Sequence, residues 1–380
     1  MSPLSKKIDD LLTSNALTKM QLDQAIDILQ PIFKDRSDAV VEIVLKDNQV
    51  FAQALKVLEV ADKCAYHTLN LATLRVRIFD VLVGIVRDFE KTELINAQLQ
   101  RDFEAGISLN KVENILYHTN LFLYKLIYRP NFEKALLFGQ KTLNLIMAEA
   151  EMFEEKLRLF SNFIQCYSLM GQFEDAQKFI AEGEKYFSLS ASSAYQALYI
   201  LAVSTYHNEQ GNFEAAIHLI QTHRPLLEKQ EAYPSMYFFT LNQLSYALLN
   251  SGHNEEGSQI LEQAMVAARK FHTFEETHFF ARWYALKALS QLSQPALFLL
   301  SKEMLEKSLK IYHLLYDGEA QHPAQAFVHL LLAKLFYINK HYSHALTHSH
   351  QAQAIFTKIL NGKNTFQSLE LEKLLIDLKQ

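Results

Sequence analysis

Apolar residues recur at helical spacing along most of the chain, and the stretches come in pairs separated by a short break. The clearest pair lies in residues 160–187, where Gly171 separates two apolar stripes. The first stripe consists of Phe160, Phe163, Ile164 and Tyr167, and the second of Phe173, Ala176, Phe179, Ile180 and Gly183. Because glycine tolerates a positive φ, the pattern predicts a helical hairpin that turns at Gly171.

A short sequence motif recurs along the chain at a nearly fixed interval. The segments "NFEKALLFG", "QFEDAQKFI" and "NFEAAIHLI" begin at residues 131, 172 and 212, which are 41 and then 40 residues apart. A weaker copy has Asn254 for the aromatic residue and Gly257 for the alanine, and a late copy has Lys340 for the turn glycine. Such hairpins cannot bury their apolar faces alone, so the pattern predicts a stacked array of about eight helix pairs.

The repeated positions resemble those of the tetratricopeptide repeat, which has small, aromatic and bulky residues at fixed offsets. In one unit these positions hold Ser204, Gly211, Phe213, Ala216 and Ile220. The resemblance spans roughly residues 116–360 and implies an all-α, right-handed superhelical solenoid of antiparallel helix pairs. The units exceed the usual length of about 34 residues, and in this they loosely resemble the Rap, NprR and PlcR peptide-sensing regulators.

The pattern divides the chain into three parts. Residues 1–110 form an N-terminal helical region of degenerate repeats or a bundle, 111–363 the solenoid, and 364–380 a C-terminal helix. We expect the last helix to cap the final unit because an open end needs covering, although a partner could bind it instead. Thr18 and Gln21 predict a capping box at a helix start, and Pro225 should kink or end a second helix.

Composition narrows the class of protein. Hydrophobic residues make up 49% and charged residues 21%, which indicates a folded chain. The formal net charge of −5 gives no basic footprint for nucleic acid or an anionic membrane. The two cysteines, Cys64 and Cys166, are far apart in the sequence, which favours a reducing compartment over a disulfide framework. Charged residues occupy the positions where a signal peptide would have its apolar core. We therefore expect a cytoplasmic protein without a membrane partner.

Candidate chemistry is sparse. The sequence contains no glycine-rich nucleotide loop and no nucleophile elbow, so we expect neither an enzyme nor a cofactor. His341, His344 and His348 share one helical face, a spacing that can hold a metal. However, that segment has no acidic residue, and the repeat pattern places the three on the outer face of a second helix. A solvated face, rather than a metal site, is the interpretation we favour.

The resemblance implies that the first helices of the pairs line a concave groove. Amide side chains both donate and accept hydrogen bonds, which suits the main chain of a bound peptide, and tyrosine adds contact area. The residues that the resemblance places in this groove are Tyr117, Asn120, Tyr124, Tyr128, Arg158, Gln165, Asn208, Asn242, Tyr246, Asn250, Lys334 and Tyr337.

These observations lead to one main hypothesis and two others. The main hypothesis is a non-catalytic scaffold that binds a protein segment or peptide in the groove. The alternative is a peptide-controlled regulator whose superhelix changes conformation on binding and acts on a partner through its N-terminal helices. A third, DNA binding by residues 1–50, is not favoured because Pro31 interrupts the segment and no basic recognition helix follows. The sequence does not decide whether the chain forms a homodimer through its terminal helices.

Overall fold

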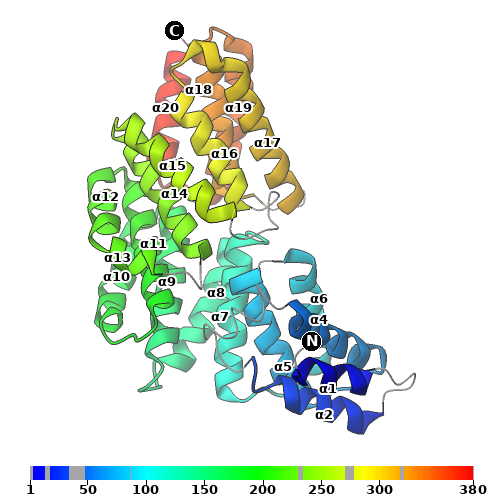
Figure 1. The fold of residues 1–380 in the computed structure, drawn as a ribbon. Coiled ribbons are helices and arrows are strands. Elements are labelled where there is room, and N and C mark those ends of the chain that lie inside the picture. Colours follow the sequence, from blue (N-terminus) through cyan, green and yellow to red (C-terminus); the bar gives the residue numbers. More distant parts are fainter. Residues whose placement is uncertain are drawn as a thin grey trace. The chain divides into compact units, whose positions relative to one another are not determined.

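The computed structural model describes residues 3–12, 18–33, 48–86, 88–229, 234–269, 278–316 and 321–379. Every regular element in these ranges is a helix (Figure 1). Contacts divide the chain into two units, Met1–Leu123 and Tyr124–Gln380. The sequence placed the division after residue 110, just before helix α7 (Lys111–Ile127), whereas the contacts place it within that helix.

The N-terminal unit is built from helices of 10 to 16 residues that pack on one another. They are α1 (Pro3–Leu12), α2 (Lys19–Leu29), α4 (Asn48–Lys63), α5 (Leu69–Val81) with a π-helical end (Leu82–Val86), and α6 (Phe89–Glu104). Helix α4 packs against α1 and α2, and α5 packs against α2 and α6. The capping box at α2 is confirmed, because Thr18 N donates to Gln21 Oε1 at 2.9 Å and Gln21 N donates to Thr18 Oγ1 at 3.3 Å. Residues 34–47 of the segment considered for DNA binding lie outside the described residues.

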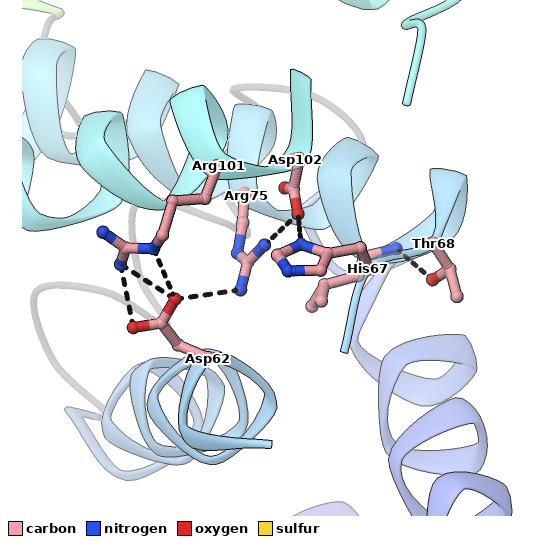
Figure 2. Close-up of polar contacts among 7 residues, drawn as sticks. Asp62, His67, Thr68, Arg75, Arg101 and Asp102 are labelled. Atoms are coloured by element: carbon pink, nitrogen blue, oxygen red, sulfur yellow. Dashed lines mark hydrogen bonds and ion pairs between the residues drawn. The ribbon is translucent and has the colours of Figure 1, made fainter. Parts of the chain in front are cut away.

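A charged network joins α4, α5 and α6 (Figure 2). Arg75 of α5 and Asp102 of α6 are both completely buried, and Arg75 Nη1 donates to Asp102 Oδ1. His67 Nδ1 lies 2.7 Å from the same oxygen. At the end of α4, Asp62 accepts hydrogen bonds of 2.8 Å from Arg101 at both carboxylate oxygens. The network fixes the three helices in one register.

We expect Asp102→Asn to destabilise this unit strongly, because it removes the buried carboxylate nearest to the guanidinium of Arg75 and leaves only Asp62, 4.0 Å away. The free energy of opening α5, measured by native-state hydrogen exchange, should fall by about 3–5 kcal/mol. Glu59→Gln is the matched control, since Glu59 pairs with Lys63 within α4 and both side chains are exposed. It should cost at most about 1 kcal/mol. Equal losses in the two variants would show that burial of the pair is not what matters.

The second unit, which we call the repeat unit, is a row of antiparallel helix pairs that follows α8 (Phe132–Ile146). The pairs are α9 (Phe153–Leu169) with α10 (Phe173–Phe187), α11 (Ser193–Gln210) with α12 (Phe213–Thr222), α14 (Pro234–Asn250) with α15 (Asn254–Arg269), α16 (His278–Gln291) with α17 (Phe298–Leu315), and α18 (Pro323–Ile338) with α19 (Tyr342–Leu360). We call α9, α11, α14, α16 and α18 the first-helix layer, because each packs against the next. Each second helix packs against its own first helix. The prediction of an all-α solenoid of helix pairs is confirmed.

The turns of the hairpins are where the sequence placed them. Gly171, Gly211 and Gly252 adopt φ values of 68°, 79° and 91°, and Lys340 takes the equivalent position with φ 62°. The break predicted at Pro225 is also confirmed. Helix α12 ends at Thr222, and a separate short helix, α13 (Arg224–Glu228), contains Pro225 in its first turn. Local sequence therefore determines where each helix ends.

Close approach between hairpins depends on small residues inside the second helices. A Cβ added to Gly183 of α10 would lie 2.4 Å from Cε2 of Tyr199 in α11. The Tyr199 hydroxyl donates to the Ile180 carbonyl oxygen at 2.8 Å, which holds the ring over the glycine. The glycine thus allows a buried tyrosine to join two neighbouring hairpins.

Gly183→Ala should therefore destabilise the repeat unit, although alanine is the better helix former by about 1 kcal/mol. Displacing the Tyr199 ring should cost about 1–3 kcal/mol of unfolding free energy in urea, monitored by fluorescence of the sole tryptophan, Trp283. Glu184→Ala, at an exposed position in the same helix, should change it by less than about 0.5 kcal/mol. A stabilised Gly183→Ala variant would refute the packing argument.

Candidate binding surface on the first-helix layer

The last helix, α20 (Phe366–Asp377), lies against the first-helix layer. It packs on α18 and α19, as a terminal cap would, and also on α11, which is far earlier in the chain (Figure 1). We call the surface of the first-helix layer on which α20 lies the inner face. The candidate site is built from side chains of this face.

Four first helices and α20 meet in one polar and aromatic group, which we call the central cluster: Glu209, Tyr246, Arg282, Phe327 and Gln367. The guanidinium of Arg282 lies 4.8 Å from the ring centroid of Tyr246 and 4.5 Å from that of Phe327. It makes no hydrogen bond or ion pair with the residues that the structure describes. The two rings therefore position the guanidinium, and its N–H groups can still donate hydrogen bonds to an anionic partner.

Glu209 of α11 is the acidic member of the cluster and is 6% exposed. Gln367 Nε2 lies 3.5 Å from Glu209 Oε1 and 3.3 Å from the Tyr246 hydroxyl oxygen. Burial raises the pKa of Glu209 to about 7, and the positive charge of Arg282 opposes that rise. The cluster can therefore gain or lose a proton near neutral pH.

Buried amide side chains in the first-helix layer lack hydrogen-bond partners. Asn242 of α14 is 3% exposed, and neither its Oδ1 nor its Nδ2 has a partner among the described residues. The same holds for Asn162 of α9. In Asn208 of α11 the Nδ2 donates to Gln243 Oε1 at 2.8 Å, but the Oδ1 has no partner in the described part of the chain. Each unpaired buried group costs about 1–3 kcal/mol, so the packing of the layer does not account for these residues.

The predicted groove residues fall into separate environments. Tyr117 and Asn120 belong to the N-terminal unit, where the Tyr117 hydroxyl donates to Asn96 Oδ1 at 3.0 Å and Asn120 Nδ2 donates to Asp80 Oδ1 at 2.7 Å. In the repeat unit, Tyr124 and Tyr128 stack on each other with ring centroids 6.0 Å apart. These four side chains thus contact their own helices and the helices next to them.

The remaining predicted residues lie along the repeat unit. Arg158 is buried and Gln165 is half-buried. Asn250 Nδ2 donates to the Tyr246 carbonyl oxygen at 2.8 Å, and the Tyr337 ring packs edge-on against Tyr342. Lys334 Nζ donates to Glu370 Oε2 of α20 at 3.0 Å. Among the predicted set, the structure therefore brings Tyr246 and Lys334 together at α20, and it leaves Asn208 and Asn242 with unpaired atoms.

The predicted groove set lacks several residues of this surface, among them Asn162, Arg282, Phe327 and Gln367. Asn162 lies between the predicted groove positions Arg158 and Gln165, and Gln367 belongs to the segment interpreted as a cap. Arg282 lies in α16, whose partner helix follows the repeat pattern only loosely, so its register could not be assigned. The available signal was an arginine between aromatic residues in "FFARWY".

The histidine face of α19 is partly solvated, as expected. His341 and His344 are exposed, but the interpretation is wrong for His348, whose Nδ1 lies 3.1 Å from His329 Nδ1 of α18. Burial, followed by the charge of His348, lowers the pKa of His329 to about 4. Within the described ranges, no three His, Cys, Asp or Glu residues lie close enough together to share a metal ion. No helix there is long and apolar enough to cross a membrane.

Comparisons with known proteins find similarity to solved structures. No family model matches the sequence, and no curated protein matches it. The crystal structure of the apo form of RapI is similar to this chain, with a TM-score of 0.43 and 14% sequence identity over 100% of this chain and 98% of that chain.

We expect Glu209 to contribute stability to the repeat unit that is lost as pH rises from about 4.5 to 7, whereas the buried His329, whose pKa is lowered to about 4, contributes in the opposite direction. Glu209 keeps its proton in the folded state across this range, whereas the unfolded chain loses it. Glu209→Gln should remove this dependence and raise stability at pH 8 by up to about 3 kcal/mol. Urea unfolding followed by Trp283 fluorescence measures the effect. Glu214→Gln, at an exposed site in α12, should leave the pH profile of the native protein unchanged. An identical pH slope in the Glu209→Gln variant would contradict the assignment.

Proposed function

We propose that this chain is a non-catalytic scaffold that binds a protein segment or peptide on the inner face of the first-helix layer. The observation that carries the proposal is the set of buried, unpaired amide atoms of Asn162, Asn208 and Asn242 on three successive first helices. A side-chain amide both donates and accepts, and an extended peptide offers one N–H and one C=O per residue. Because these amides are buried in the unliganded layer, a ligand must part the side chains that cover them, and its main chain then satisfies groups that the fold leaves without partners.

The central cluster supplies a second means of recognition. Arg282 is positioned by two aromatic rings and makes no ion pair with a described residue. A guanidinium binds a carboxylate through two parallel hydrogen bonds, so the cluster suits an acidic side chain or the carboxyl end of the bound segment. Amides that hold the main chain and a cation that fixes one end would together set the register of the ligand.

A second function, control by the bound peptide, is favoured by the connectivity of the cluster. Its members come from α11, α14, α16, α18 and α20, so a ligand that contacts Arg282 acts on helices from separate hairpins at once. A ligand shifts a conformational equilibrium only by its difference in affinity between the two states. Under this proposal, the radius of gyration in solution scattering decreases when the peptide binds. An unchanged radius of gyration at a saturating concentration of peptide would contradict control by the peptide and leave only the scaffold proposal.

The main proposal predicts that stability and binding move in opposite directions in Asn242→Leu. Removing an unpaired buried amide should raise the unfolding free energy by about 1–3 kcal/mol. The same change should weaken a peptide selected from a random library on the native chain by at least about tenfold, which is about 1.4 kcal/mol in calorimetry.

Gln263→Leu serves as the matched control, because Gln263 is an exposed amide on the second helix of the same hairpin. It should leave the affinity of the selected peptide unchanged. Native affinity in both Asn242→Leu and Asn208→Leu would reject the inner face as the binding surface.

A further inference from the structure

The C-terminal helix occupies part of the inner face. Its buried side is formed by Gln367, Ser368, Leu371, Leu374 and Leu375. The opposite side, with Leu369, Lys373 and Ile376, is exposed. Helix α20 is thus an amphipathic segment laid against the first-helix layer (Figure 1), in the manner of a helical ligand in a groove.

Three side chains at the start of α20 make its contacts with earlier hairpins and with α18. The Phe366 ring packs edge-on against Phe213, with centroids 4.8 Å apart. Gln367 contacts the Tyr246 hydroxyl at 3.3 Å, and Glu370 accepts a hydrogen bond from Lys334 at 3.0 Å. We call Glu209, Phe213, Tyr246 and Lys334 the α20 strip, because they are the side chains that these three residues contact.

Two turn glycines make room for the segment that leads into α20. A Cβ on Gly171 would lie 2.8 Å from the Asn364 carbonyl oxygen, and one on Gly211 would lie 3.0 Å from the Phe366 ring. At the beginning of this segment, Asn361 and Gly362 adopt φ values of 45° and 81°, which reverse the direction of the chain after α19. The segment therefore crosses to the turns of the α9–α10 and α11–α12 hairpins, well beyond the pair that a terminal cap needs to cover.

The polar contacts that hold the start of α20 are individually weak, so its apolar face supplies most of the attachment. The Lys334–Glu370 pair is partly exposed, with 26% and 23% of the side chains accessible, and such pairs contribute about 0–1 kcal/mol. The Gln367–Glu209 contact is long, at 3.5 Å. Because Tyr246 follows Asn242 by one helical turn, the start of α20 also lies near the unpaired amide of Asn242. Helix α20 is held where a ligand would bind, by contacts that a competing segment can replace.

We propose that the α20 strip is a docking site for an amphipathic helical segment, and that α20 is its resident, displaceable occupant. The matching partner carries an aromatic residue, an amide next to it and a carboxylate three residues later, followed by leucines on the same face. These features reproduce Phe366, Gln367, Glu370, Leu371 and Leu374. The inference goes beyond the proposed function, because it concerns a helical partner and does not depend on the buried amides.

A labelled peptide with the sequence of residues 364–379 tests the inference on the full-length chain. In the native protein the tethered α20 competes at an effective concentration in the millimolar range. The full-length variant with Phe366→Ala and Glu370→Lys weakens that competitor, since Glu370→Lys places a third cation beside Lys334 and Lys373. We expect fluorescence anisotropy to show at least tenfold tighter peptide binding to this variant than to the native chain.

Two controls separate specific docking from general apolar association. A peptide in which Gln367 and Glu370 are both replaced by alanine should bind the variant at least tenfold more weakly. Ile376→Ala, at a side chain of α20 that is 58% exposed, should leave the native chain's low affinity unchanged. If the variant does not melt cooperatively, Gln367→Ala with Glu370→Gln replaces it and removes only the polar contacts.

Peptide binding that is equal for the native chain and a folded variant would overturn the inference. A variant that dimerises by exchanging α20 between copies, and loses the dimer when the peptide is added, would support it, because each strip is then filled by a helix from the partner. Failure of this test leaves the Asn242 experiment unaffected, since that experiment uses a different peptide and the native α20.

Discussion

The repeat unit depends on one constraint: a single helical hairpin exposes more apolar surface than it buries, so each first helix must pack against the next. Ala176, Ala216 and Gly257 are buried in the second helices and keep each hairpin thin enough to stack. At Gly257 even a Cβ would lie 2.9 Å from Leu249, so the space is already filled. The first helices consequently form a continuous layer, and that layer gathers residues that are far apart in the sequence.

The polar character of the layer follows from the same stacking. Glu209, Tyr246, Arg282 and Phe327 come from four hairpins and can meet only because their helices lie side by side. A buried polar group in such a place is costly unless it is paired, and pairing within the layer is incomplete. Amides, a cation held by rings and a carboxyl that titrates near neutral pH are together suited to recognition of another polypeptide. The chain's own last helix already occupies part of that surface.

Features encoded within one hairpin could be predicted from the sequence. The turn at Gly171, the break at Pro225 and the capping box at Thr18 each depend on a few neighbouring residues, and all three are present. The repeat register also identified Asn208, Asn242, Tyr246 and Lys334 as residues of the first helices, and these are the positions from which the binding proposal was built. Their placement in a ligand site stays a prediction.

Contacts between distant segments could not be predicted in this way. Gln367 meets Glu209 across 158 positions of sequence, and no local pattern encodes that pairing. Likewise, His348 is half-buried because His329 of α18 lies beside it, although its own helix face is mostly exposed.

The most direct test of the central claim is a crystal structure of the chain with a library-selected peptide. The account predicts that the peptide main chain lies on the first-helix layer and hydrogen-bonds to the side-chain amides of Asn242 and Asn208. A peptide bound to the second helices, or one on the inner face that leaves both amides unpaired, would contradict it.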